Sequence, residues 1–356
     1  MKKKILKIMF CPECHGIFSV KNEVIKHKEI IEGTLECMSC HAEFPVIRYV
    51  PRLIKGYNYS DSWGELWKET GHLLRDSYTG MTFYHDTLFG KYSEENIQKK
   101  GLSPFGFDWP RSLKSEKILE IGPGTGVCTE HLVKTGAELV CIDMSDAIDT
   151  FPENLLTQPN INVIQADINN NIIQENYFDR IWLFQVLQHT PYPGETLKVL
   201  KKFIKKGGEL AFTSYGGEIF KSWYYGITKR INDKFSWKYI SLLSPILVPL
   251  KYRLMKLNIS LIFKAAKLLL APFDPRNIYY QTLEGKMDQW PSGIIWNKTH
   301  DYKLLMQYVI INTFDRITPK YTNSATHATI EKWSKEAGYS KIKIWGKGGV
   351  RARVYK

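Results

Sequence analysis

Lys117-Ile-Leu-Glu-Ile-Gly-Pro-Gly-Thr-Gly126 reads as a short apolar strand that runs into a tight glycine turn. A helix-compatible segment follows this turn as far as Lys134. Glycine allows backbone dihedral angles that other residues disfavour, and the N-terminus of the following helix favours polar or anionic groups. Such a loop, taken alone, is a weak signal for a nucleotide site.

Strands and helices alternate on both sides of this loop. This alternation predicts a parallel, doubly wound sheet with its ligand at the carboxyl ends of the strands. The expected strands are 117–121, 138–142, 161–165, 178–184 and 209–214, and a helix is expected over 194–206.

Acids stand at the ends of the second and third expected strands. Asp143 lies 17 residues beyond Gly126, where it can accept hydrogen bonds from the hydroxyls of an adenosine ribose. Asp167 follows the third strand and can meet the adenine amino group. Two ligands compete for this edge, a dinucleotide and S-adenosylmethionine. The three glycines lack the longer gap that pyrophosphate binding prefers, and the Glu120 carboxylate would repel a pyrophosphate, so we expect S-adenosylmethionine.

Several motifs resemble those of the class I S-adenosylmethionine-dependent methyltransferases. They are Glu120-Ile-Gly-Pro-Gly-Thr-Gly126, Asp143-Met-Ser145, Gln165-Ala-Asp-Ile168, Phe178-Asp179 and Val186-Leu-Gln-His-Thr-Pro191. The resemblance implies a cofactor-binding set of Glu120, Gly122, Gly124 and Gly126 at the methionine part, Asp143 and Met144 at the ribose, Asp167 and Ile168 at the adenine, and Gln185 closing the pocket.

Two further apolar runs, 341–345 and 350–355, flank a glycine-rich turn and predict an antiparallel hairpin. The hairpin would complete a seven-stranded, Rossmann-like methyltransferase sheet at its edge. We therefore expect an α/β methyltransferase domain over 113–356, with a helical lid inserted after strand five at about 215–312. Specificity for the acceptor is expected to lie in 215–330.

Four of the six cysteines form two matched pairs, Cys11 with Cys14 and Cys37 with Cys40. Two residues between thiolates let one tight turn present both sulfurs to one ion, and two such turns make a tetrahedral all-cysteine zinc site. Four protein ligands close the coordination sphere, so this zinc would be structural. Two disulfides are the alternative, which a reducing compartment disfavours.

The sequence around these pairs resembles the small zinc-ribbon family whose free-standing members activate tRNA methyltransferases. The resemblance rests on Cys11-Pro-Glu-Cys14, Gly33-Thr-Leu-Glu-Cys37-Met-Ser-Cys40, Phe44-Pro-Val-Ile47 and Val50-Pro-Arg-Leu53. We expect a zinc ribbon over residues 1–55 and a helical linker and cofactor cover, rich in aromatic residues, over 56–112.

Three residues are candidates for work on the acceptor. His189 follows the fourth strand, and Asp315 and His327 lie in a stretch that resembles a motif of zinc-ribbon-linked methyltransferases. A histidine that titrates near neutral pH suits deprotonation of a hydroxyl or amine, and Asp315 can orient either histidine. The alternative for His327 is a place in the first turn of a helix capped by Thr326.

Composition narrows the class of protein. The 356 residues are 44% hydrophobic and 24% charged, which excludes a disordered, collagen-like or disulfide-dense chain. The formal net charge of +13 favours an anionic partner. The basic, apolar segment 253–270 predicts an amphipathic helix that lies on an anionic membrane, receives a polyanionic acceptor, or packs on the domain.

The leading hypothesis is a cytoplasmic methyltransferase, with peripheral membrane contact as an option, that modifies a small molecule, a sugar or a lipid-linked glycan in polysaccharide or secondary-metabolite synthesis. No apolar run reaches the length of a membrane span, and we recognise no export signal. The first alternative is an RNA methyltransferase, because the net charge of +13 suits phosphate contacts. The second is a non-catalytic scaffold, which the acid set of Glu120, Asp143 and Asp167 argues against.

Overall fold

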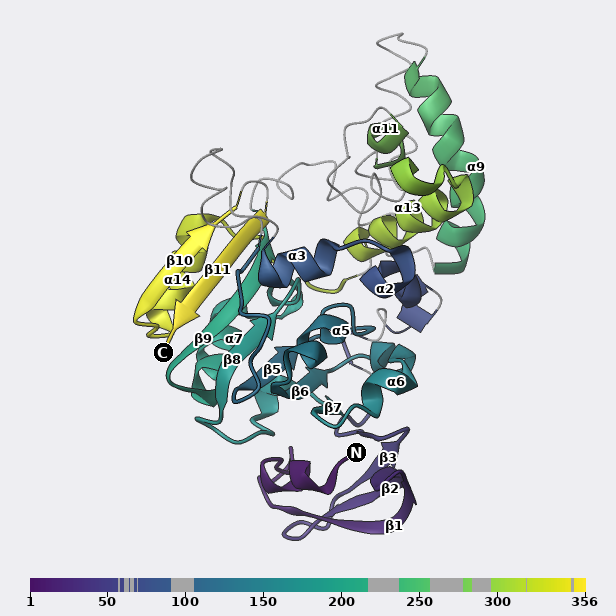
Figure 1. Cartoon of the computed structure of the whole chain (residues 1–356). Helices are drawn as coiled ribbons and strands as arrows, with labels where there is room; N and C mark the ends of the chain where they lie inside the picture. The colour runs from purple at the N-terminus through teal and green to yellow at the C-terminus, as the bar shows by residue number, and fades with distance from the viewer. Residues whose placement is uncertain are drawn as a thin grey trace. The chain divides into compact units, whose positions relative to one another are not determined.

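The computed structural model describes residues 1–56, 58–60, 64, 67–68, 70–90, 106–216, 237–256, 278–283, 296–317, 319–346 and 349–356 (Figure 1). The chain divides into two compact units. The first comprises Met1–Asp61, Tyr84–Ile219 and Tyr321–Lys356, and the second comprises Ser62–Phe83 and Phe220–Lys320.

A seven-stranded sheet with the strand order β10-β11-β9-β8-β5-β6-β7 forms the centre of the first unit. The pairs among β5 to β9 are parallel, and β11 runs antiparallel to both β9 and β10. The predicted seven-stranded α/β sheet with its terminal hairpin is therefore confirmed. The strands are β5 (Lys117–Ile121), β6 (Glu138–Asp143), β7 (Ile161–Gln165), β8 (Phe178–Leu183), β9 (Ile204–Tyr215), β10 (Lys341–Trp345) and β11 (Gly349–Tyr355).

The largest boundary difference from the sequence-based expectation lies between α7 and β9. The helix expected over 194–206 is α7 (Pro193–Phe203), and β9 begins at Ile204. The sequence Gly207-Gly208 suggested the turn between them, but both glycines lie inside the strand. Gly207 takes a φ of +80°, and the register between β8 and β9 shifts nearby, so the glycines mark an irregularity in the strand rather than its start.

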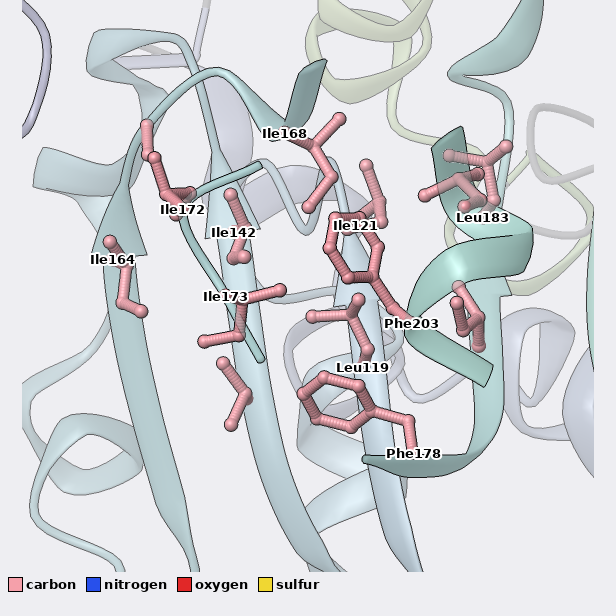
Figure 2. Packing of buried hydrophobic residues seen from close by; sticks show 14 of the residues in the cluster. Leu119, Ile121, Ile142, Ile164, Ile168, Ile172, Ile173, Phe178, Leu183 and Phe203 are labelled. Atoms are coloured by element: carbon pink, nitrogen blue, oxygen red, sulfur yellow. The ribbon is translucent and has the colours of Figure 1, made fainter. Parts of the chain in front are cut away.

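Alternate residues of the parallel strands point to one hydrophobic layer. Leu119, Ile121, Ile142 and Leu183 pack there against Phe203 of α7 (Figure 2). α14 (His327–Glu336) contributes Ile330 to the same cluster. This layer fixes the strands so that their carboxyl ends share one edge. The shorter helices of the unit are α3 (Phe83–Phe89), α5 (Thr129–Leu132) and α6 (Glu153–Leu156), with 3₁₀ turns η1 (Lys3–Lys7), η3 (Val133–Thr135), η4 (Asp146–Thr150), η5 (Ile168–Asn170) and η6 (Leu187–His189).

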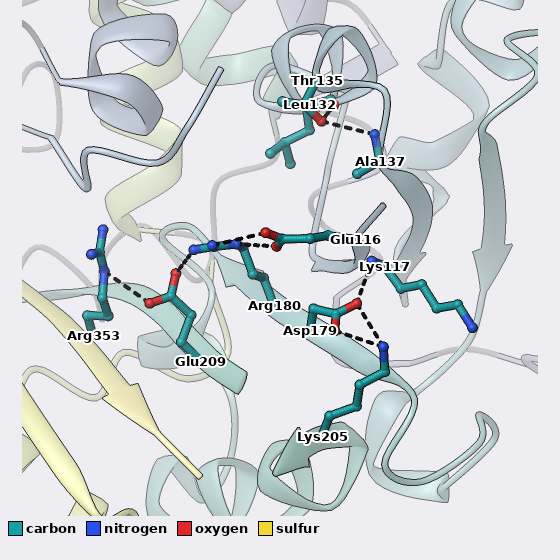
Figure 3. A network of polar contacts seen from close by, with 10 residues as sticks. All are labelled: Glu116, Lys117, Leu132, Thr135, Ala137, Asp179, Arg180, Lys205, Glu209 and Arg353. Carbon is teal, nitrogen blue, oxygen red and sulfur yellow. Dashed lines mark hydrogen bonds and ion pairs between the residues drawn. The ribbon is translucent and has the colours of Figure 1, made fainter. Parts of the chain in front are cut away.

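An ion-pair ladder crosses the strands near the opposite end of the sheet (Figure 3). Arg180 on β8 pairs with Glu116 and with Glu209 of β9, and Glu209 also pairs with Arg353 of β11 at 3.5 Å. Asp179 accepts hydrogen bonds from the Lys117 backbone and the Lys205 ammonium. These contacts tie four strands together at the end remote from the glycine loop.

The N-terminal residues form a separate antiparallel sheet in the order β1-β2-β3-β4. Its strands are β1 (Phe18–Lys26), β2 (Glu29–Cys37), β3 (Glu43–Ile47) and β4 (Val50–Pro51). Phe18 and Phe44 pack edge to face inside it, 5.9 Å between ring centroids. Cys37 is the last residue of β2, and Cys11, Cys14 and Cys40 lie outside the strands.

This small sheet is joined to the edge strand β7. The Leu53 amide donates to the Gln165 carbonyl at 2.8 Å, and Arg52 pairs in parallel with Gln165. A second connection runs through Phe10, whose amide donates to the Ile172 carbonyl. Apolar residues of both sheets belong to one hydrophobic cluster, so the two sheets share a core.

The second unit is helical within its described residues. It contains η2 (Gly71–Leu74), α2 (Asp76–Thr79), α9 (Trp237–Lys256), α11 (Ile278–Leu283) and α13 (Tyr302–Ile317). Most of the segment 253–270 lies outside the described residues, and with it the predicted basic amphipathic face. Among the described residues, no helix combines the length and the apolar character needed to cross a bilayer.

Candidate cofactor and metal sites

The glycine loop between β5 and α5 has a backbone that only glycine tolerates well. Gly122 and Gly124 have φ values of +64° and +56°. A Cβ on Gly122 would lie 2.2 Å from a methyl group of Val186, whereas a Cβ on Gly124 would meet nothing within 4 Å. The space above Gly124 is therefore open to a ligand that approaches the backbone closely.

Asp143, at the end of β6, is tied to that loop. Its Oδ2 accepts a hydrogen bond from the Gly124 amide at 2.8 Å, and its Oδ1 accepts from the Ser145 amide and hydroxyl at 2.8 and 2.7 Å. Burial raises the pKa of the Asp143 carboxyl, and the backbone donors oppose that shift. A carboxylate offers about four acceptor positions, so these three bonds leave capacity for a ligand hydroxyl.

Asp167 and Ile168 lie at the end of β7, next to β6 in the sheet. The Oδ1 atom of Asp167 caps η5 by accepting from the backbone and side chain of Asn169, both at 2.9 Å. Asp167 is half-buried and Ile168 is buried beside it. The second carboxylate oxygen of Asp167 can accept a hydrogen bond from the edge of a purine, and the apolar side chain of Ile168 can contact its face.

Glu120 lies inside the fold rather than at the mouth of the loop. Its side chain is 2% exposed, and its Oε2 accepts hydrogen bonds from the Thr129 hydroxyl at 2.7 Å and the Cys141 thiol at 3.3 Å. Burial raises the pKa of Glu120 to about 7. These contacts join Glu120 on β5 to Thr129 of α5 and Cys141 of β6, so its side chain stabilises the structure next to the glycine loop.

Gln185 and Met144 complete the sequence-predicted cofactor set. Gln185 is exposed after β8, takes a φ of +55°, and donates its amide to the Thr213 hydroxyl at 2.8 Å. The Met144 carbonyl accepts from the Asn58 side chain at 3.4 Å. Glu120, the three glycines, Asp143, Met144, Asp167, Ile168 and Gln185 all lie at the carboxyl ends of β5, β6, β7 and β8.

Tyr59 is a site residue that the sequence did not single out. Burial, followed by the nearby charge of Asp167, raises the pKa of the Tyr59 phenol, and Asp143 adds to the shift. The Tyr59 ring packs edge to face on Tyr321, 5.4 Å between centroids. The segment 56–112 has many aromatic residues, and nothing in the pattern distinguished this one from the packing residues around it.

Of the candidate catalytic residues, His189 lies at the same edge. Its Nδ1 is 3.1 Å from the Tyr321 carbonyl oxygen, and its ring packs edge to face on Tyr215 at 5.5 Å. His327 is exposed and begins α14, where the Thr326 hydroxyl caps the helix by accepting from the Thr329 amide. Asp315 belongs to α13, and its side chain lies outside the described residues.

The four N-terminal cysteines converge. Cys11, Cys14, Cys37 and Cys40 bring their sulfurs within 4.8 Å of one another. Two of the sulfur pairs are 3.8 and 3.4 Å apart, whereas tetrahedral Zn–S bonds of about 2.3 Å place sulfurs about 3.8 Å apart. A Cβ on Gly16 would lie 2.7 Å from the Cys37 sulfur, so glycine is needed for the two turns to approach this closely. The donor set and spacing fit a structural zinc ion.

A family model described as a methyltransferase domain matches residues 119–212. A ubiquinone biosynthesis O-methyltransferase from Coxiella burnetii is 33% identical over 118 residues, which is 33% of this chain and 50% of that protein. A protein of the same name from Pseudomonas fluorescens is 26% identical over 106 residues, 29% of this chain and 46% of that protein. The chain thus spans about half the length of the curated relatives it matches.

Solved structures give weaker similarity. An S-adenosylmethionine-dependent methyltransferase from Aquifex aeolicus is 18% identical with a TM-score of 0.30, over 46% of this chain and 76% of that chain. One from Mesorhizobium loti is 18% identical with a TM-score of 0.26, over 30% of this chain and 49% of that chain.

Proposed function

We propose that this chain, which contains a class I methyltransferase domain, transfers a methyl group from S-adenosylmethionine to a hydroxyl or amine of a small molecule, a sugar or a lipid-linked glycan. The observation that carries the proposal is the hydrogen bond from the Gly124 amide to Asp143, with Asp167 just after the end of the neighbouring strand β7. A glycine loop tied to one acid, with a second acid next to it, suits an adenosine with a short chain at its 5′ end. The family match covers the loop and both acids.

The relatives narrow the proposed acceptor atom. The two curated proteins are named O-methyltransferases, which supports a hydroxyl acceptor. A lipid-linked acceptor has separate support from the second unit, where Leu242 and Ile246 on α9 are 70% and 66% exposed at a helical spacing. Such a helix suits contact with a membrane surface.

In the proposed reaction the bound cofactor supplies a methyl group on a sulfonium centre. Asp143 accepts a hydrogen bond from the ribose, and the half-buried Asp167 and buried Ile168 hold the adenine. His189 accepts the proton of the acceptor group. Methyl transfer is an in-line displacement, so the main contribution of the protein is to position the two reactants. His327 stays a candidate for binding or deprotonating the acceptor, and Asp315 stays a candidate for orienting either histidine.

The four cysteines, on this proposal, hold a structural Zn²⁺ in a ribbon over residues 1–55. The supporting observation is the convergence of four unbridged thiols. A zinc thiolate site needs a reducing compartment, which fits the proposed cytoplasmic location. We assign the cofactor cover to 56–112 and the acceptor lid to about 215–312.

Calorimetric titration with S-adenosylhomocysteine tests the cofactor assignment. We expect the unmodified chain to bind and Asp143→Ala to lose about five- to thirtyfold in affinity, because an unpaired ribose hydroxyl costs roughly 1–2 kcal/mol. The matched control is Asp179→Ala, which removes an acid at the remote end of the same sheet. A folded chain that takes up no ligand, or equal losses in both variants, would contradict the proposal.

RNA is the second candidate acceptor, favoured by the net charge of +13. Contacts with phosphates release counterions, so RNA binding by this chain would weaken steeply as salt rises. Titration with transfer and ribosomal RNA between low and physiological salt distinguishes the two acceptor classes. Steep salt dependence with micromolar binding would favour RNA, and its absence would favour the small-molecule or glycan acceptor.

A further inference from the structure

The chain that leaves the inserted segment runs across the turn that holds His189. Asn323 makes two hydrogen bonds there. Its backbone amide donates to the Gln188 carbonyl at 2.7 Å, and its side-chain Nδ2 donates to the Thr190 carbonyl, also at 2.7 Å. One asparagine thus binds the carbonyls of the residues immediately before and after His189.

The same segment contacts the imidazole ring itself. The His189 Nδ1 atom is 3.1 Å from the Tyr321 carbonyl oxygen. A carbonyl oxygen can only accept a hydrogen bond, so Nδ1 must carry the hydrogen. In the neutral ring, Nε2 is then the nitrogen with the lone pair, which is the form that can take a proton.

The segment is anchored beyond this contact as well. The Ala325 amide donates to the Tyr215 carbonyl at 2.9 Å, and Gly216 pairs with Ala325 in a parallel bridge. Tyr215 also packs its ring on His189. The backbone over 321–325 is therefore fixed both at the turn after β8 and at the end of β9, which defines the position of the Tyr321 carbonyl.

We propose that Asn323 is a positioning residue that holds the Tyr321 carbonyl against His189 and so keeps Nε2 as the proton acceptor. This inference rests on the proposed function, in which His189 deprotonates the acceptor. A carbonyl partner sets the tautomer without adding a negative charge beside the ring, unlike a carboxylate. A main-chain carbonyl thus orients the His189 ring, and the side chain of Asp315, the other group expected to orient a histidine, lies outside the described residues.

The proton balance of the step is simple. Nε2 of His189 takes the proton of the acceptor hydroxyl while the acceptor oxygen forms a bond to the methyl carbon. The electron pair of the broken carbon–sulfur bond stays on sulfur, which becomes a neutral thioether. His189 is left as an imidazolium that donates from both nitrogens, with Nδ1 still on the Tyr321 carbonyl.

Nitrogen-15 NMR of the full chain labelled at histidine tests the tautomer directly, without cofactor or acceptor. His189 is assigned by comparison with His189→Gln, and spectra are recorded at a pH where the ring is neutral. A hydrogen bond of ordinary strength predicts that the Nδ1–H form exceeds the Nε2–H form by about fivefold. A dominant Nε2–H form in the unmodified chain overturns the inference.

Asn323→Ala tests the role of the side chain, and Asn160→Ala is its matched control. The Asn160 Nδ2 also donates to two backbone carbonyls, those of Val133 and Ala137, at 2.9 and 2.8 Å, in a turn away from His189. We expect the tautomer ratio to fall to about twofold or less in Asn323→Ala and to stay unchanged in Asn160→Ala. An unchanged ratio in Asn323→Ala, or an equal fall in both, overturns the inference.

A second variant and a ligand titration separate a failure of this inference from a failure of the variant to fold or of the proposed function. If Asn323→Ala fails to fold, Asn323→Ser is measured instead, and the tautomer of the unmodified chain is decisive by itself. Titration of the same unmodified sample with S-adenosylhomocysteine tests the proposed function independently. Ligand uptake with a dominant Nε2–H form refutes only the inference, whereas the Nδ1–H form without uptake refutes only the proposed function.

Discussion

Glu120 shows how one buried carboxyl links stability to pH. Burial raises its pKa from 4.5 to about 7, partly opposed by the hydrogen bonds from Thr129 and Cys141. The folded chain therefore holds a proton between these values that the unfolded chain has lost. The free energy of unfolding should fall as pH rises from about 4.5 to about 7, by up to about 3 kcal/mol.

Glu120→Gln should remove this dependence of stability on pH in thermal melts at pH 5 and 7.5, while the exposed Glu195→Gln control should keep it. Equal slopes in the two variants would show that Glu120 is ionised in the fold.

Strands could be predicted from the sequence where residues close in the chain define their ends. The strand over 161–165 has the predicted bounds, and the hairpin over 341–355 pairs as expected, because apolar runs bounded by turn residues carry that information locally. The glycines within β9 misled the prediction because a turn and a strand irregularity share the same residues. Tyr59 and Asn323 were not predictable as site residues, since their roles depend on segments far apart in sequence.

The ion-pair ladder joins β5, β8, β9 and β11 at the end of the sheet remote from the glycine loop. Arg180→Met leaves Glu209, whose side chain is 7% exposed, with only Arg353 as an ion-pair partner in the ladder. Removing one member of a largely buried pair should cost about 2–4 kcal/mol in the free energy of unfolding by urea. Lys198→Met breaks an exposed pair with Glu195 on α7 and should cost under about 0.5 kcal/mol. If the two variants lose similar amounts of free energy of unfolding, the ladder stabilises the fold no more than an exposed ion pair does.

At the scale of the first unit, the cysteine-bearing sheet supports the segments that follow both acids. Arg52 donates to Gln165 at 3.1 Å and pairs with Asp149 at 2.6 Å, in the turn after Asp143. The Gln174 amide donates to the Ile8 carbonyl, in the turn after Asp167. The N-terminal sheet is thus part of the framework of the proposed adenosine site, and a spacing rule for cysteines alone could not have revealed this.

Metal removal should therefore loosen more than the proposed ribbon. A structural zinc ion contributes its binding free energy to folding, so chelation should unfold the turns around Cys11 and Cys37 and lower the melting temperature by at least about 5 °C. Hydrogen exchange should accelerate at the Leu53 amide, which bonds to Gln165, and over 146–156. The hairpin of β10 and β11 lies at the opposite edge of the sheet and serves as the internal control, where exchange should stay slow. If hydrogen exchange accelerates only within residues 8–45, the proposed ribbon folds independently and does not stabilise the seven-stranded sheet.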